Sequence, residues 1–113
     1  TGHETTAVND LLAISGDISI EMGAEAKYLL AQAMFDNGDY TGCEAEIMEF
    51  INMSTPYAYW LARSFVLLSD LYAAQGKTME ARQYLQSLSN NYSGDDDIAS
   101  MINERMERLT SGN

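Results

Sequence analysis

The chain has 113 residues, enough for one domain with its own core, because a chain of this size buries about two-thirds of the surface it exposes when unfolded. Its 17 acidic and 6 basic residues give a net charge of −11, which argues against binding nucleic acid or an anionic membrane and allows a basic partner. No apolar run reaches the about 18 residues of a membrane-spanning helix, and the single cysteine, Cys43, excludes an internal disulfide.

The N-terminal half predicts a short helix followed by a helical hairpin. Residues 5–15 carry apolar side chains on one face and stop before Gly16. Residues 21–37 and 40–52 show the same helical spacing, and Gly38 between them tolerates the left-handed backbone of a tight turn. The side chains predicted to face inward are Ala24, Leu30, Ala31, Met34, Tyr40, Cys43, Ile47, Phe50 and Ile51.

The C-terminal half predicts a second hairpin and a final helix. Residues 54–56, Ser-Thr-Pro, break the chain before a long apolar helix over 57–75. Gly76 marks the turn into a helix over 78–90, and the last helix covers 95–109. The apolar side chains of these helices include Trp60, Leu61, Phe65, Leu68, Tyr72, Ala81, Leu85, Leu88, Ile98, Met101, Ile102, Met106 and Leu109.

The two hairpins repeat one pattern at an offset of 38 residues, the separation of Gly38 and Gly76. The equivalent pairs are Leu30 and Leu68, Ala31 and Ser69, Met34 and Tyr72, Cys43 and Ala81, Ile47 and Leu85, and Phe50 and Leu88. A helix pair cannot bury its apolar face alone, so repeated pairs of this kind are expected to stack side by side.

These positions resemble the tetratricopeptide (TPR) family over about residues 21–92. The most specific stretch is Ala-Gln-Ala-Met-Phe-Asp-Asn-Gly-Asp-Tyr at 31–40, with a small residue where the helices cross and a glycine at the turn. Lys27 departs from the pattern because an aromatic residue is usual there, although Phe65 fills that place in the second unit. Lys77-Thr78 also replaces the Asp-Tyr that follows the first glycine.

The resemblance implies an all-α, right-handed α-α superhelix of antiparallel hairpins, about six helices forming a single domain over 1–113. The implied organisation is a helix of a preceding unit at 5–15, repeat 1 at 21–53, repeat 2 at 56–92 and a capping helix at 95–109. The long units are similar to those of bacterial periplasmic and outer-membrane-associated TPR proteins, which favours that location over the cytoplasm.

Catalytic, metal and cofactor sites are not expected. His3, the only histidine, lies near the N-terminus, and Cys43 falls where a small buried residue is wanted. The acids at 95–97 are consecutive, which suits the start of a helix better than a calcium loop. The glutamates at 44, 46 and 49 are expected mostly to face water.

By resemblance, a partner would lie in the concave groove lined by the first helix of each unit. The residues implied there are Tyr28, Gln32, Phe35, Arg63, Val66 and Asp70. The alternative is that flanking helices cover these side chains. The basic clamp that some family members use for peptide carboxylates is not expected, because this groove offers mainly Arg63, with Lys27 nearby and acids around both.

The sequence therefore predicts a non-catalytic scaffold that binds a protein or peptide. The alternative function is a C-terminal cap of a longer solenoid, or self-association into a homo-oligomer through the N-terminal end.

Overall fold

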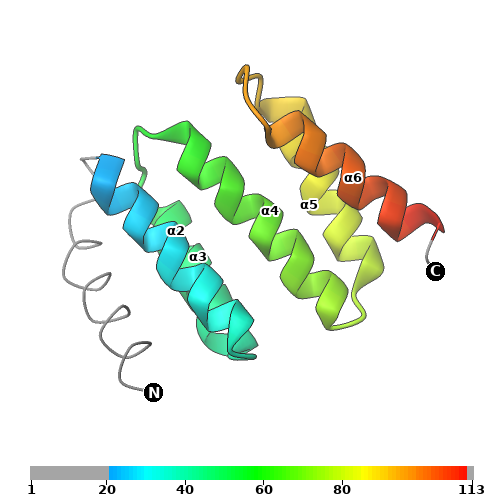
Figure 1. Ribbon diagram of the computed structural model, residues 1–113, viewed down its shortest axis with the longest axis horizontal. Helices are drawn as coiled ribbons and strands as arrows, with labels where there is room; N and C mark the ends of the chain where they lie inside the picture. Colours follow the sequence, from blue (N-terminus) through cyan, green and yellow to red (C-terminus); the bar gives the residue numbers. More distant parts are fainter. Residues whose placement is uncertain (1–20, 112–113) are drawn as a thin grey trace. The chain divides into compact units, whose positions relative to one another are not determined.

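The computed structural model describes residues 21–111, which form five α-helices and no strand (Figure 1). The helices are α2 (Glu21–Asp36), α3 (Tyr40–Asn52), α4 (Ala58–Ala74), α5 (Thr78–Asn91) and α6 (Ile98–Ser111). The all-α prediction is confirmed, and each of these helices begins and ends close to its predicted bounds. The helix predicted over 5–15 lies outside the described residues. None of the described helices is long and apolar enough to cross a bilayer.

The chain divides into two compact units whose boundary falls inside α4, between Leu61 and Ala62. Unit 1 includes α2, α3 and the first residues of α4. Unit 2 includes the rest of α4, α5 and α6.

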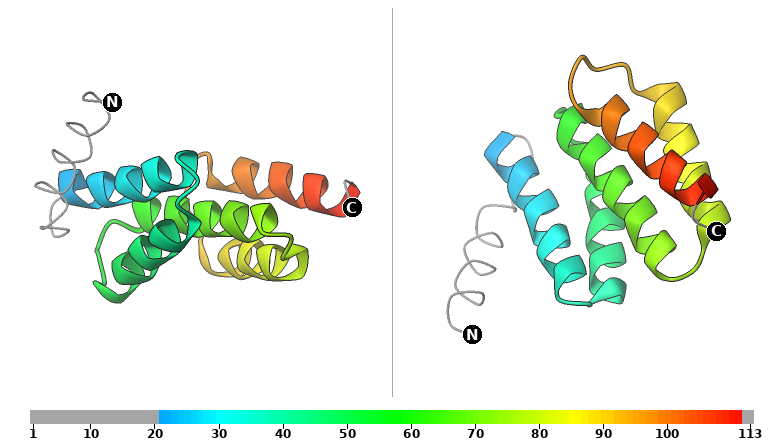
Figure 2. Two further views of the ribbon diagram at one scale, coloured as in Figure 1. Left: turned by 90° about the horizontal axis from the view of Figure 1, so that it is seen from below. Right: turned by 45° about the vertical axis from the view of Figure 1, so that its right-hand side comes forward.

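In unit 1, α2 and α3 pack as an antiparallel hairpin (Figure 2). Ala24 of α2 and Phe50 of α3 are fully buried against each other, and the side chains packed around them are Met53, Tyr57, Trp60 and Leu61. Leu30, Cys43 and Ile47, all predicted to face inward, are buried as well.

In unit 2, Tyr84 of α5 contacts two aromatic rings of α4. Its ring centroid lies 6.4 Å from that of Phe65 and 5.4 Å from that of Tyr72. Helix α6 packs along α5 (Figure 1) and buries Ile98 and Ile102, two members of its predicted apolar stripe.

The two hairpin turns have the same backbone geometry. Gly38 and Gly76 have φ values of 80° and 79°, in the left-handed region where a side chain is strained. The amide of Gly38 donates to the carbonyl of Phe35 at 3.0 Å, and that of Asp39 donates to Met34 at 2.9 Å. The second turn repeats both bonds 38 residues later, Gly76 to Ala73 at 3.0 Å and Lys77 to Tyr72 at 2.8 Å. Both are Schellman motifs, which satisfy the last carbonyl groups of a helix.

The helices that follow these turns begin differently. Asp39 caps α3, because its Oδ1 accepts a hydrogen bond from the amide of Gly42 at 3.0 Å. Lys77 occupies the same position before α5 and makes no side-chain cap. At α6, Asp96 accepts from the amide of Ile98 at 3.0 Å, so the acids at 95–97 do mark the start of a helix.

Candidate functional site

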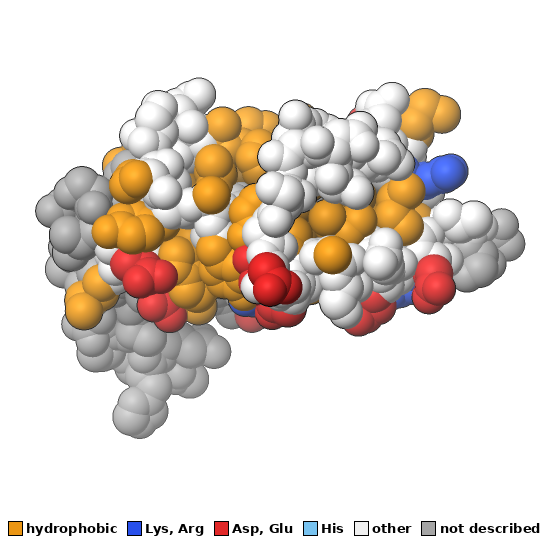
Figure 3. Space-filling view, turned by 90° about the horizontal axis from the view of Figure 1, so that it is seen from above, with side chains coloured by type: hydrophobic (Ala, Val, Ile, Leu, Met, Phe, Trp, Pro, Cys, Tyr) orange, Lys and Arg blue, Asp and Glu red, His pale blue; other side chains and the backbone are white. Residues whose placement is uncertain are grey.

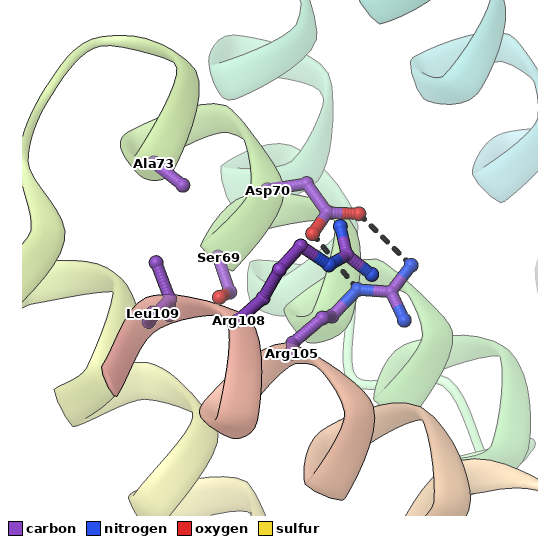
Figure 4. A pocket seen from close by; sticks show the side chains of 6 residues that line it. All are labelled: Ser69, Asp70, Ala73, Arg105, Arg108 and Leu109. Carbon is purple, nitrogen blue, oxygen red and sulfur yellow. Dashed lines mark hydrogen bonds and ion pairs between the residues drawn. The ribbon is translucent and has the colours of Figure 1, made fainter. Parts of the chain in front are cut away.

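A small pocket of about 100 Å³ lies between α4 and α6 of unit 2 (Figure 4). Its lining residues are Ser69, Asp70 and Ala73 from α4, and Arg105, Arg108 and Leu109 from α6. The pocket therefore combines apolar walls with one acidic and two basic side chains, a composition typical of sites that hold a polar group of a ligand in one orientation.

Asp70 and Arg105 form a two-point ion pair in this pocket. Arg105 donates from Nε to Oδ1 at 2.8 Å and from Nη2 to Oδ2 at 3.1 Å. A third bond, from Nη1 to the carbonyl of Met101 at 3.3 Å, ties the guanidinium to its own helix. The two side chains are 26% and 22% exposed, so water still reaches the pair. This geometry fixes the position of α6 against α4 and holds Arg105 in place.

Arg108 is the exposed cation of the pocket. Its side chain is 63% exposed, and Nη2 donates to Glu104 one turn earlier at 2.9 Å. Figure 4 shows Arg105 and Arg108 extending from the same face of α6 toward Asp70. Because an exposed ion pair of this kind contributes little stability, Arg108 can exchange Glu104 for the carboxylate of a ligand at small cost.

The predicted groove residues of unit 1 are partly buried. The Tyr28 ring packs 5.8 Å from that of Trp60 and is buried, so it offers almost no surface to a partner. Its hydroxyl donates to Gln32 at 2.9 Å, and Gln32 donates to Asp36 at 3.0 Å. Phe35 is half-buried against Tyr40, with ring centroids 5.4 Å apart.

The predicted groove residues of unit 2 have different environments. Val66 is buried and Arg63 is half-buried. Of the three, only Asp70 lines the α4–α6 pocket, where its carboxylate is already paired with Arg105. Arg63, Val66 and Asp70 were implied to line one groove. Asp70 instead contacts the last helix.

Sequence reasoning missed Arg105 and Arg108. Their spacing of three residues places both on one face of a helix, and that signal was available. The prediction of a capping helix over 95–109 gives neither side chain a role. The bounds of α6 do not predict which helix it packs against. The contact between α6 and α4 places both arginines beside Asp70.

A second charged cluster lies inside unit 1. Lys27 of α2 is buried and pairs with both Glu46 and Glu49 of α3. Burial lowers the pKa of Lys27, but the hydrogen bonds and charges of the two glutamates outweigh burial and raise this pKa above 10.5. The Glu46 side chain is only 14% exposed, so the expectation that it faces water is wrong; Glu49 is exposed as expected. Glu46 turns inward because it neutralises the buried ammonium group.

Cys43 is fully buried, as predicted. Burial raises the pKa of its thiol from 9.0 to about 11, and the nearby negative charges of Asp39 and Glu44 act in the same direction. Since the thiolate is the reactive form, Cys43 is suited to filling space rather than to nucleophilic chemistry.

Within residues 21–111, no three His, Cys, Asp or Glu side chains are grouped as a metal site would require. Comparisons with protein-family models, curated proteins and solved structures find no match to this chain. The resemblance to the TPR family therefore remains a prediction, based on the sequence pattern.

Proposed function

We propose that this chain is a non-catalytic protein-binding module, a TPR-like α-α superhelix that holds a peptide or helix of a partner. The matching Schellman turns support this proposal, because they repeat one hairpin at the 38-residue offset found in the sequence. Helical repeats of this kind expose extended surfaces that other proteins bind.

The observation that carries the proposal is the α4–α6 pocket. Arginine is enriched at the energetic centres of protein interfaces, and a charge-assisted hydrogen bond contributes roughly 1.5–3 kcal/mol. Arg105 is held by Asp70, whereas Arg108 is exposed and lines the same pocket as the apolar side chains of Ala73 and Leu109. The ligand that suits this arrangement is a peptide that presents a carboxylate to Arg108 and an apolar group to the walls.

The distribution of charge allows such a ligand despite the net charge of −11. Residues 62–113 contain five basic and seven acidic side chains, a net charge of −2. Residues 1–61 contain one basic and ten acidic side chains, a net charge of −9, and the two values sum to −11. Nearly all the positive charge is therefore in the part of the chain that forms the pocket.

Selection from a random peptide library displayed on phage, with the full chain as target, tests the proposal. We expect enriched peptides to contain a carboxylate next to an apolar residue, and Arg108→Gln to weaken their binding about tenfold, the equivalent of 1.4 kcal/mol. Arg82→Gln is the matched control, because Arg82 is an exposed arginine of α5 that does not line this pocket. An equal loss in both variants, or no enrichment, would argue against the proposed site.

The repeated turns also favour the second candidate, a C-terminal cap of a longer solenoid. The discriminating observation is the gene sequence upstream of Thr1. Further units of about 34–38 residues there would support the structural role.

A further inference from the structure

Helix α2 has one continuous outer face. At about 100° per residue, its exposed side chains and three of its half-buried ones, Glu25, Gln32 and Ala33, fall within a sector of about 120°. The members of this α2 outer face are Glu21, Met22, Glu25, Leu29, Gln32, Ala33 and Asp36. The buried residues of the helix occupy the remaining sectors, so the outer face is a surface distinct from the hairpin core.

Two large apolar side chains lie on this face. Met22 is 62% exposed and Leu29 is 40% exposed, and their separation of seven residues places them two turns apart on one side of the helix. The position equivalent to Leu29 in the second hairpin is Leu67, 38 residues later, which is buried. The same position of the repeat is therefore buried in the second hairpin and accessible in α2.

The charged side chains exposed on the described part of unit 1 are all acidic. The described part of unit 1 has seven acidic residues and one basic residue, Lys27. Lys27 is buried between Glu46 and Glu49, so the surface formed by residues 21–61 carries no exposed cation. Glu21, Glu25 and Asp36 lie on one side of the exposed apolar pair on α2. The space-filling view shows acidic and apolar groups close together on the face that it displays (Figure 3).

We propose that the α2 outer face is a docking surface for a basic amphipathic helix of another protein. The apolar side of that helix would cover Met22 and Leu29, and its Lys or Arg side chains would pair with Glu21, Glu25 and Asp36. The 16 residues of α2 extend for about 24 Å, enough to contact several turns of a partner helix. A second copy of the chain fits poorly, because its own α2 outer face presents the same acids. This surface lies in unit 1 and does not depend on the α4–α6 pocket.

The test uses a synthetic peptide of about 18 residues, with Leu and Lys at helical spacing, titrated into the full chain by calorimetry at low salt. The control peptide keeps every Leu and replaces every Lys with Glu. We expect the Lys peptide to bind with one site per chain and the Glu peptide not to bind. Equal binding of both peptides, or no binding of either, would overturn the proposal.

Substitutions locate the peptide on the protein. Met22→Gln and Leu29→Gln remove apolar contact while keeping the charge and nearly the same helix propensity, and each is expected to weaken binding about tenfold, because the peptide then buries less apolar surface. Met79→Gln is the matched control, because Met79 is exposed like Met22 but lies on α5 in unit 2. It is expected to change the Kd less than about twofold. No effect at any of the three positions would mean that the peptide binds by charge alone, and equal losses at all three would mean that it does not bind at the α2 outer face; either result contradicts the proposal.

Two further readouts exclude other occupants of the face. Light scattering of the free chain is expected to show no concentration-dependent dimer; a dimer that Leu29→Gln dissociates would make the face a contact between copies. Circular dichroism is expected to show Leu29→Gln as folded and nearly as stable as the parent chain. A large loss of stability would mean that the chain itself covers Leu29 in solution. Either of these results overturns the proposal.

Discussion

Two equivalent positions in the hairpins are filled by opposite kinds of side chain. In unit 1, Lys27 of α2 pairs with Glu46 of α3. Exactly 38 residues later, in unit 2, Phe65 of α4 packs against Tyr84 of α5. One hairpin thus joins its helices with a buried ion pair where the other uses two aromatic rings. The repeat therefore specifies a contact between these positions and leaves its chemistry open.

The two chemistries differ in what happens when one partner is removed. A ring that loses its neighbour leaves a gap, whereas a carboxylate that loses its cation in a buried site is left with an uncompensated charge. Unit 1 is therefore expected to be the more sensitive of the two to single substitutions at this contact.

The largest effect is expected from Lys27→Phe. It leaves Glu46 largely buried without its cation, and we expect a loss of about 3 kcal/mol in the free energy of unfolding, measured by urea denaturation. The double variant Lys27→Phe with Glu46→Tyr reproduces the contact of unit 2 and is expected to recover most of that loss. A double variant as unstable as the single one would show that the two contacts are not interchangeable.

The same contact also gives a pH dependence. Because the pKa of Lys27 is raised in the folded chain, its stabilising contribution is complete below pH 10.5 and is lost as the pH rises through the raised value.

The second effect compares Cys43 with Ala81, its equivalent in unit 2, both of which are fully buried. The pKa of the thiol rises from 9.0 unfolded to about 11 folded, so the unfolded chain loses this proton first. Stability is therefore expected to fall from about pH 9 upward, by about 2 kcal/mol at pH 10.5. Cys43→Ala should remove that part of the pH dependence. The check is urea denaturation of both proteins at pH 8 and pH 10.5; parallel losses would contradict the assignment.

A smaller effect is expected at the partly exposed ion pair of unit 2. Asp70→Asn keeps the shape of the side chain and one acceptor, so Arg105 retains part of its contact and water compensates the rest. We expect a loss of about 1 kcal/mol at low salt and less in 1 M NaCl, where exposed charges are screened. A loss as large as that of Lys27→Phe would contradict the difference in burial between the two pairs.

The last comparison, which includes the smallest expected effect, concerns the two helix starts. Asp39→Ala removes the cap of α3 and is expected to cost about 1 kcal/mol, whereas Lys77→Ala, at the equivalent position, removes no cap and should cost less. Lys77→Asp supplies α5 with the cap it lacks and is expected to stabilise the chain by several tenths of a kcal/mol. Thermal unfolding followed by circular dichroism measures the relative stability of these three variants.

The positions of the helices, their ends and the repeat follow from the amino-acid sequence without the fold. Apolar spacing and local turn chemistry decide these features, and the Schellman turns at Gly38 and Gly76 depend only on residues within one helical turn of each glycine. The buried residues Leu30, Cys43, Ile47, Phe50 and Leu85 were predictable for the same reason.

Only the tertiary structure sets which polar side chains of different helices meet. Lys27 and Glu49 are 22 residues apart, and Asp70 and Arg105 are 35 residues apart, so no local pattern signals either pair. Glu46 was expected in water because its own helix places it among exposed acids, yet a buried ammonium on α2 brings it inward. A buried charged side chain brings its counter-charge into the buried site with it. For these pairs the partner is determined by how the helices pack, not by spacing along one helix.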